Sequence, residues 1–254
     1  MRLKRSSRSL ERKDKTMNSS VNHNHGTQTF TSLFSLILTG GLLSLAGGAQ
    51  LQAGLAETLH KNPNVAPPDS VSYGKSYDQW EDTYLRWVFG ASTIEPDANG
   101  NAVVNNVVLL PFLFPAADET PQSADVTMTG GQPFMMTLYG FVGFSYADGT
   151  PSDEFLDLSL FQTLEIKLTL DGVTLIDGDN AMQYFSQIPF EPPIPGDSYS
   201  SIWFQGIGVV HTALPPGAHT LRLDAKNTIP IPPNFGDPVF ELHNTWNITV
   251  QAGR

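Results

Sequence analysis

From residue 102 onward, the chain is a succession of short β-forming runs separated by tight-turn signals. Asp171-Gly172 and Pro215-Pro216-Gly217 each lie between two such runs, and each is read as a hairpin connection. Several runs alternate apolar and polar residues, as strands with one buried and one solvated face do. Eight or nine strands joined in this way predict a mainly β fold, a two-sheet antiparallel β-sandwich of jelly-roll or Ig-like type. The expected strands are 102–110, 125–129, 134–146, 164–170, 173–176, 201–214, 219–225 and 239–250, with proline-rich loops at 189–197 and 227–238.

One strong amphipathic helix pattern precedes these strands. Ser76 is placed to cap the helix, and Gln79 follows at the capping-box spacing. Aromatic residues recur at three- and four-residue steps and therefore share one face. This spacing favours a helix packed on the sandwich, and the alternative is a platform on which sugar rings stack. The candidate binding residues are Tyr77, Trp80, Tyr84 and Trp87 of this stripe, together with Trp203.

The beginning of the chain has the pattern of an export signal. A basic segment within residues 1–16 is followed by an apolar run at 33–49 and by small residues, so residues 1–56 are predicted to be a signal peptide with a preceding basic segment. A membrane anchor is the alternative, but the run is short and contains glycines. Residues 57–72 are a polar lead-in, and residues 73–254 are expected to form a single sandwich domain. The expected location is secreted or periplasmic, without stable membrane insertion after cleavage.

Charge and composition narrow the classes of function. The formal net charge is −11, and removal of residues 1–56 would leave 7 basic and 23 acidic side chains. Such a surface repels nucleic acid and anionic membranes. The sequence has no cysteine, which excludes disulfides, thiolate metal sites and cysteine nucleophiles.

Metal binding is a weaker prediction. Asp177, Asp179 and Asn180 resemble part of a calcium loop, because Ca²⁺ prefers alternate oxygen ligands, but the closing glutamate of the twelve-residue pattern is missing. An ordinary turn is the favoured interpretation, and Ca²⁺ is the one cofactor considered. Three histidines in the strand region are a second candidate set, although strand alternation argues against their convergence. They are His211, His219 and His243.

Two segments carry a family resemblance: Tyr73-Gly74-Lys75-Ser76-Tyr77 before the helix, and Leu214-Pro215-Pro216-Gly217-Ala218-His219-Thr220 in a turn. Together with the closing segment 246–250, they resemble a family of secreted bacterial proteins without an established activity. The resemblance implies a fold and an export route, and it carries over no catalytic residue.

Two classes of function follow from these patterns. The first is a secreted, non-enzymatic β-sandwich with a binding or envelope role, for which a polysaccharide is one candidate ligand. The second is a carbohydrate-active hydrolase or lyase on a jelly-roll-like sandwich. That enzyme would need a groove lined by Trp203, Tyr199 and two facing carboxylates, and Asp153, Glu154 and Asp157 cluster in the sequence. Self-assembly is a third alternative, and the oligomeric state stays open.

Overall fold

The computed structural model describes residues 64–114, 120–227 and 241–253. All of them lie in one compact unit that spans residues 53–254. The expected signal peptide lies outside the described residues, as does nearly all of the proline-rich stretch at 227–238. In the part of the chain that is described, no helix is long and apolar enough to cross a membrane.

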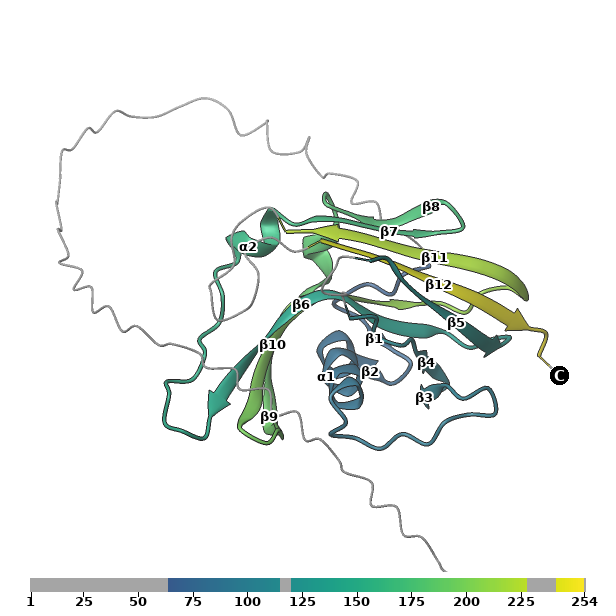
Figure 1. Cartoon of the computed structure of the whole chain (residues 1–254). Coiled ribbons are helices and arrows are strands. Elements are labelled where there is room, and N and C mark those ends of the chain that lie inside the picture. The colour runs from purple at the N-terminus through teal and green to yellow at the C-terminus, as the bar shows by residue number, and fades with distance from the viewer. Residues whose placement is uncertain (1–63, 115–119, 228–240, 254) are drawn as a thin grey trace, which may run out of the picture. The chain divides into compact units, whose positions relative to one another are not determined.

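Two five-stranded sheets pack on a shared hydrophobic core and form a β-sandwich (Figure 1). The mainly β, two-sheet sandwich with an N-terminal helix predicted from the sequence is therefore confirmed. The first sheet has the order β3 (Ala102–Val104), β4 (Val107–Leu109), β6 (Phe134–Tyr146), β10 (Tyr199–His211) and β9 (Phe185–Pro195). The second has the order β5 (Gln122–Thr129), β12 (Glu241–Gln251), β11 (Gly217–Lys226), β7 (Glu165–Leu170) and β8 (Val173–Asp177). The remaining elements are β1 (Val71–Ser72) paired with β2 (Lys75–Ser76), α1 (Tyr77–Val88), α2 (Ser159–Gln162) and the 3₁₀ turn η1 (Ala181–Tyr184).

Each sheet contains one parallel pair in an otherwise antiparallel arrangement. β4 runs parallel to β6, and β12 runs parallel to β5. The first of these follows from the path of the chain. β5 lies between β4 and β6 in the sequence but belongs to the second sheet, so the chain crosses over before it returns beside β4. A parallel pair requires such a crossover instead of a tight hairpin.

One of the two predicted hairpins is wrong. The Asp-Gly turn at 171–172 does close a hairpin, with Leu170 opposite Val173. The Pro-Pro-Gly turn at 215–217 instead connects β10 of the first sheet to β11 of the second. Because β10 already pairs with β6 on one edge and β9 on the other, the following strand cannot form a hairpin with it, and it joins the second sheet. Leu214 is buried along this crossing.

Two other segments differ from their sequence-based predictions. The run at 102–110 is a hairpin of β3 and β4, because Asn105 and Asn106 both adopt positive φ angles, as a tight type I′ turn requires. The proline-rich segment at 189–197, expected to be a loop, lies largely within β9. Prolines are tolerated there because β9 is an edge strand, whose free side needs no N–H donors.

Helix α1 packs on the first sheet, on the side opposite the second sheet, and adds a third layer (Figure 1). Ser76 caps the helix, and the reciprocal bonds between Ser76 and Gln79 complete the predicted capping box. The face toward the sheet carries the aromatic stripe and is buried. The described part of the polar lead-in also joins the fold, since Val65 bridges to His211 at the end of β10.

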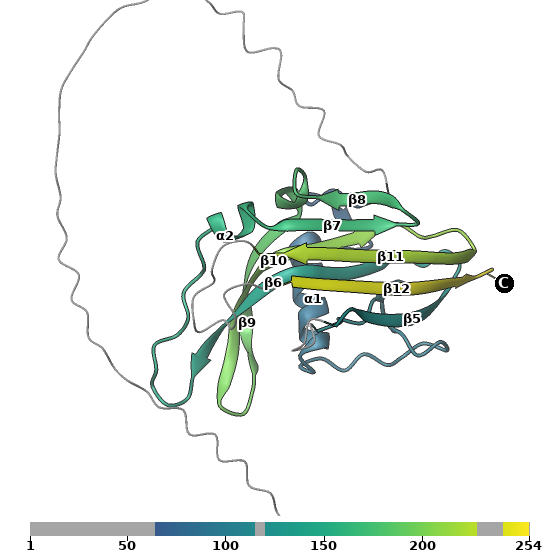
Figure 2. The same ribbon diagram turned by 45° about the horizontal axis from the view of Figure 1, so that its top comes forward.

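At one end of the molecule, β6, β10 and β9 project beyond the strands of the second sheet (Figures 1 and 2). The projecting part includes the pairs Tyr199–Tyr146 and Ser201–Phe144. We call it the extension. Because the second sheet does not reach it, the extension displays side chains that a sandwich interior would otherwise cover.

Candidate functional site

Five aromatic side chains gather on the extension and the segment beside it, and we call this set the aromatic end. It consists of Phe144, Tyr146, Phe155, Tyr199 and Trp203. The ring centroids of Phe144 and Tyr199 are 4.6 Å apart and those of Phe144 and Tyr146 are 6.5 Å apart, both edge-to-face. In a second contact, the ring centroids of Phe155 and Trp203 are 5.1 Å apart, and the two ring planes are inclined by 40°. Such edge-to-face pairs add stability beyond burial alone and fix the rings relative to one another.

Strand register explains how the rings are distributed. Phe144 and Tyr146 are two residues apart on β6, so they share a face with Tyr199, which lies opposite Tyr146. A register shift between Ser201 and Trp203 inserts an extra residue in β10 and reverses the alternation. Trp203 therefore lies opposite Gly143, and a β-carbon on Gly143 would lie only 1.9 Å from the indole ring.

Asp153 holds the aromatic end together. Its carboxylate accepts hydrogen bonds from the backbone N–H of Phe144 at 3.0 Å and from the Tyr146 hydroxyl at 3.0 Å. Its backbone carbonyl accepts the indole N–H of Trp203 at 2.8 Å. Desolvation raises the pKa of Tyr146, and the neighbouring Asp153 carboxylate raises it further. One residue thus fixes rings on both faces of β6.

Two rings of the aromatic end are open to solvent, as are single rings elsewhere in the described residues, such as Phe114 and Tyr73. Tyr199 is 48% exposed and Phe155 is 44% exposed, whereas Phe144 and Tyr146 are half-buried. Trp203 is only 4% exposed beneath Phe155. Tyr199 packs beside Phe144 on one face of the extension, and Phe155 packs over Trp203 on the other, so each face displays one exposed ring.

The structure places the four helical candidates elsewhere, between α1 and the first sheet. Tyr77, Trp80 and Tyr84 are buried, and Trp87 is half-buried with its ring edge-on to Tyr84. The indole N–H of Trp80 donates to the carbonyl of Ser72, and the hydroxyl of Tyr84 donates to the carbonyl of Leu110. These side chains hold the helix on the sheet. Of the five candidates, only Trp203 belongs to the aromatic end.

Sequence reasoning did not single out Phe144, Tyr146 or Phe155. A usable signal was present, because the long run at 134–146 stays aromatic up to its last residue, where a strand leaving a sandwich is expected to become polar. Tyr199 was named only as part of a groove for the enzyme hypothesis, and it is the most exposed ring of the set.

The three clustered carboxylates do different things. Asp153 organises the aromatic end, whereas Asp157 accepts a hydrogen bond from the backbone N–H of Ser159 at the start of α2. That bond lowers the pKa of Asp157. Glu154 is exposed.

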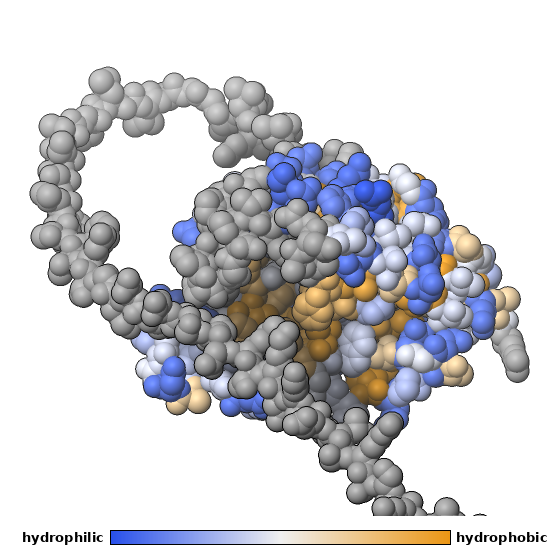
Figure 3. Space-filling model, in the orientation of Figure 1, coloured by the Kyte–Doolittle hydropathy of each residue, from blue (hydrophilic) through white to orange (hydrophobic). Residues whose placement is uncertain are grey.

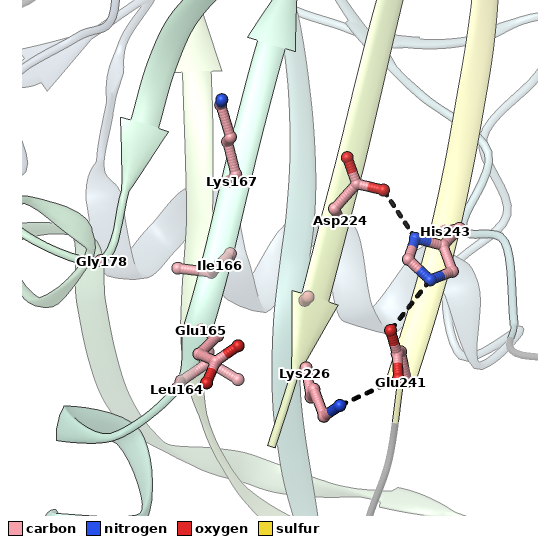
Figure 4. A pocket seen from close by; sticks show the side chains of 10 residues that line it. Leu164, Glu165, Ile166, Lys167, Gly178, Asp224, Lys226, Glu241 and His243 are labelled. Atoms are coloured by element: carbon pink, nitrogen blue, oxygen red, sulfur yellow. Dashed lines mark hydrogen bonds and ion pairs between the residues drawn. The ribbon is translucent and has the colours of Figure 1, made fainter. Parts of the chain in front are cut away.

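A second feature is a depression of about 530 Å³ on the outer face of the second sheet, lined by β7, β11 and β12 (Figure 4). His243 lies between Asp224 at 2.6 Å and Glu241 at 3.2 Å, and Lys226 pairs with Glu241 at 3.4 Å. Hydrogen bonding to Asp224 is the main reason that the pKa of His243 is raised. Since a carboxylate lies at each ring nitrogen, both nitrogens act as donors only in the protonated imidazolium.

These charges follow directly from strand register. Asp224 lies opposite both His243 and Lys167, while Lys226 lies opposite Glu241 and Glu165. The result is a grid of alternating charges on the solvated face. Figure 3 agrees, because hydrophilic residues dominate the upper part of the view, where the second sheet lies. Asp224, His243, Glu241 and Lys226 are paired with one another, so we interpret this side of the depression as a salt-bridged sheet surface.

The three histidines do not converge. His219 bridges two turns, with Nδ1 at 2.7 Å from Asp171 and Nε2 at 2.9 Å from the carbonyl of Pro215. His211 is buried and stacks on Phe134, and burial lowers its pKa. Among the described residues, no group of three histidine or carboxylate side chains is arranged to hold a metal ion.

The predicted calcium-like loop is an ordinary turn in the structure. The side-chain oxygen of Asn180 accepts the backbone N–H of Asp177 at 3.0 Å, and the N–H of Asn180 returns to the carbonyl of Asp177 at 3.2 Å. The Asn180 oxygen is therefore occupied within the turn. Asp179 lies between them in the same connection from β8 to η1.

Comparisons with known proteins give little to add to this geometry. No protein-family model matches the chain, and no curated protein matches it. Among solved structures, the chain has a likeness to the CooA pilin subunit from enterotoxigenic Escherichia coli, with 12% identity over 53% of this chain and 95% of that chain. The TM-score is 0.17, so this likeness carries no argument about fold or function.

Proposed function

We propose that this protein is an exported, non-enzymatic β-sandwich that binds extracellular polysaccharide through its aromatic end. The observation that carries the proposal is that each face of the extension displays an exposed ring braced by a second aromatic side chain, Tyr199 beside Phe144 and Phe155 over Trp203. The export pattern in residues 1–56 and the family resemblance support the location.

The chemistry of the aromatic end suits a sugar. The flat faces of aromatic rings stack on the apolar faces of pyranose rings, and nearby carboxylates accept hydrogen bonds from sugar hydroxyls. Glu154 is exposed next to Phe155, and Asp148 is exposed beyond the end of β6. Stacking requires no charge on the sugar, so a neutral polysaccharide suits this surface. An anionic polysaccharide would be repelled by the acidic protein.

Rigidity supports binding by this surface. The strands of the extension are hydrogen-bonded through most of their length, and Asp153 ties Tyr146 and Trp203 to the same segment. A binding surface fixed in advance loses little side-chain entropy when the ligand arrives, which strengthens binding. Tyr199 in turn is braced by Phe144.

The test is a binding measurement with the chain lacking residues 1–56, using soluble xylan and β-1,3-glucan as neutral probes and alginate as an anionic probe. We expect at least one neutral polymer to bind, with affinity reduced about tenfold, or about 1.4 kcal/mol, by Tyr199→Ala or Phe155→Ala. Alginate should bind less well than the neutral probe.

The matched control is Tyr73→Ala, which removes an exposed aromatic ring outside the aromatic end. This control should bind as the unaltered protein does. Equal losses in all three variants, or no loss in any, would refute the assignment of the site. Release of reducing sugar that depends on Asp153 would instead favour the hydrolase or lyase.

A further inference from the structure

Glu81 is a carboxyl group sealed between α1 and the first sheet. It is 0% exposed, and it lies on the same helix face as Trp80 and Tyr84. Its Oε2 accepts a hydrogen bond from the hydroxyl of Thr137 on β6 at 2.6 Å, while its Oε1 has no hydrogen-bond partner among the described residues. A carboxylate with an unpartnered buried oxygen is strongly disfavoured, whereas a neutral carboxylic acid is tolerated far better.

The sheet is shaped to receive this group. A β-carbon on Gly208 of β10 would lie 1.9 Å from Oε1 of Glu81, so only glycine leaves room for the carboxyl. Beside it, the hydroxyl of Tyr77 contacts Gly208 twice, accepting its N–H at 2.8 Å and lying 2.7 Å from its carbonyl. The same hydroxyl lies 2.6 Å from the carbonyl of Tyr184.

The groups that act on the pKa of Glu81 include no cation. On α1 the neighbouring titratable groups are the phenols of Tyr77 and Tyr84 and the carboxylate of Asp78, and η1 adds the phenol of Tyr184. On β9, Glu191 is a further carboxylate, in a hollow lined also by Asp78 and by Lys75, whose ammonium lies over the Trp80 ring. Burial raises the pKa of Glu81 to about 8, and the hydrogen bond from Thr137 and the nearby phenol of Tyr77 only partly oppose this.

We propose that α1 is a proton-dependent clamp: docking on the first sheet takes up one proton on Glu81, so the helix is held most tightly under acidic conditions. Residues 71–88 precede every strand of the two five-stranded sheets, and α1 forms an outer layer, while residues 64–66 stay paired with the end of β10. Residues 71–88 can therefore leave the first sheet without unthreading a strand of the sandwich. Release would uncover the notch at Gly208 and expose Trp80.

The direction of the pH dependence follows from the two states. In the released helix the carboxyl has its ordinary pKa near 4.5, and in the docked helix the pKa is about 8. Between these values the docked state binds one more proton, so the docking constant falls about tenfold per pH unit as pH rises. Below pH 4.5 and above pH 8 it becomes independent of this group.

The test is native-state hydrogen exchange of the chain lacking residues 1–56, from pH 5 to pH 8, with amides of α1 compared with amides of β12. After correction for intrinsic exchange, the opening constant of α1 should rise about tenfold per pH unit. At every pH, α1 should open at a lower free energy than β12, because the amides of β12 exchange only when the whole domain unfolds. In Glu81→Gln the tenfold slope of α1 should vanish. In Asp78→Asn, which neutralises an exposed carboxylate on the same helix, it should remain.

Equal opening free energies in α1 and β12 would mean that the helix opens only with the whole fold, and they would overturn the proposal. Persistence of the slope in Glu81→Gln would overturn it as well. If that variant does not fold, a direct NMR titration of Glu81 in the unaltered sequence decides, because a pKa near 4.5 contradicts the clamp.

Discussion

The most direct test of the helix packing is Trp80→Ala. Trp80 is 0% exposed at the centre of the contact between α1 and the first sheet, and its indole N–H donates to Ser72 at 2.8 Å. Replacement by alanine removes the ring from a site with no access for water. A surface platform for sugar would behave oppositely, because it would fold normally after the same change.

The expected loss can be estimated from the burial. Truncation of a fully buried large aromatic side chain costs about 3–5 kcal/mol. Part of that loss belongs to the hydrogen bond, since the carbonyl of Ser72 is left without its donor. Trp80→Phe separates the two contributions, because phenylalanine keeps most of the apolar ring area but cannot donate the hydrogen bond. The loss of this bond should lower the free energy of unfolding by about 1–3 kcal/mol.

Urea denaturation followed by circular dichroism provides the measurement. With a slope of about 2 kcal/mol per molar urea, Trp80→Ala should lower the midpoint by about 2 M. Trp87→Ala is the graded comparison, because Trp87 is only half-buried on the same helix and should cost less. A midpoint for Trp80→Ala that equals that of the unaltered protein would refute the packing of α1 and return the stripe to the list of ligand sites.

Two further predictions concern tight contacts elsewhere. Gly143→Ala should destabilise the protein by about 1–3 kcal/mol in urea, because the new methyl group would meet Trp203, whereas Gly178→Ala in open space should change stability by less than about 1 kcal/mol. Partial burial lowers the pKa of His219, but the bonds from His219 to Asp171 and to the carbonyl of Pro215 outweigh this effect, so the pKa is raised overall. The contact between His219 and Asp171 therefore stabilises the fold below about pH 6.5, and this stabilisation is lost as the pH rises through the raised pKa. Asp171→Asn should lower the pKa of His219 in an NMR titration, and an unchanged value would contradict the pairing.

The elements with local signals were predictable. The capping box at Ser76 and Gln79 sets the start of α1, and the Asp-Gly turn at 171–172 sets the hairpin of β7 and β8. Each signal lies within a few residues of the structure it determines. The Pro-Pro-Gly turn at 215–217 has an equally clear local signal, yet it joins two sheets, because occupancy of both edges of β10 is a property of the whole fold.

The aromatic end was only partly predictable for the same reason. Trp203 and Tyr199 stood out by residue type, but their different roles depend on the register shift between 201 and 203, which no sequence pattern marked. Asp153 was noted only as one of three carboxylates. Its role depends on contacts with Trp203 and with β6, fifty and about nine residues away in the chain.

Glycines within strands are the sites where side chains from distant parts of the chain pack against the sheet. Glycines that interrupt a β-forming run are typical of a bend or bulge, because of their conformational freedom. In the structure, the lack of a side chain at these glycines is equally important for packing. Trp203 lies over Gly143, and Glu81 fills the space at Gly208. A large or polar side chain from one element thus occupies the space that a glycine leaves on another. Such a glycine marks where the sheet receives a partner, although the partner's identity follows only from the three-dimensional path of the chain.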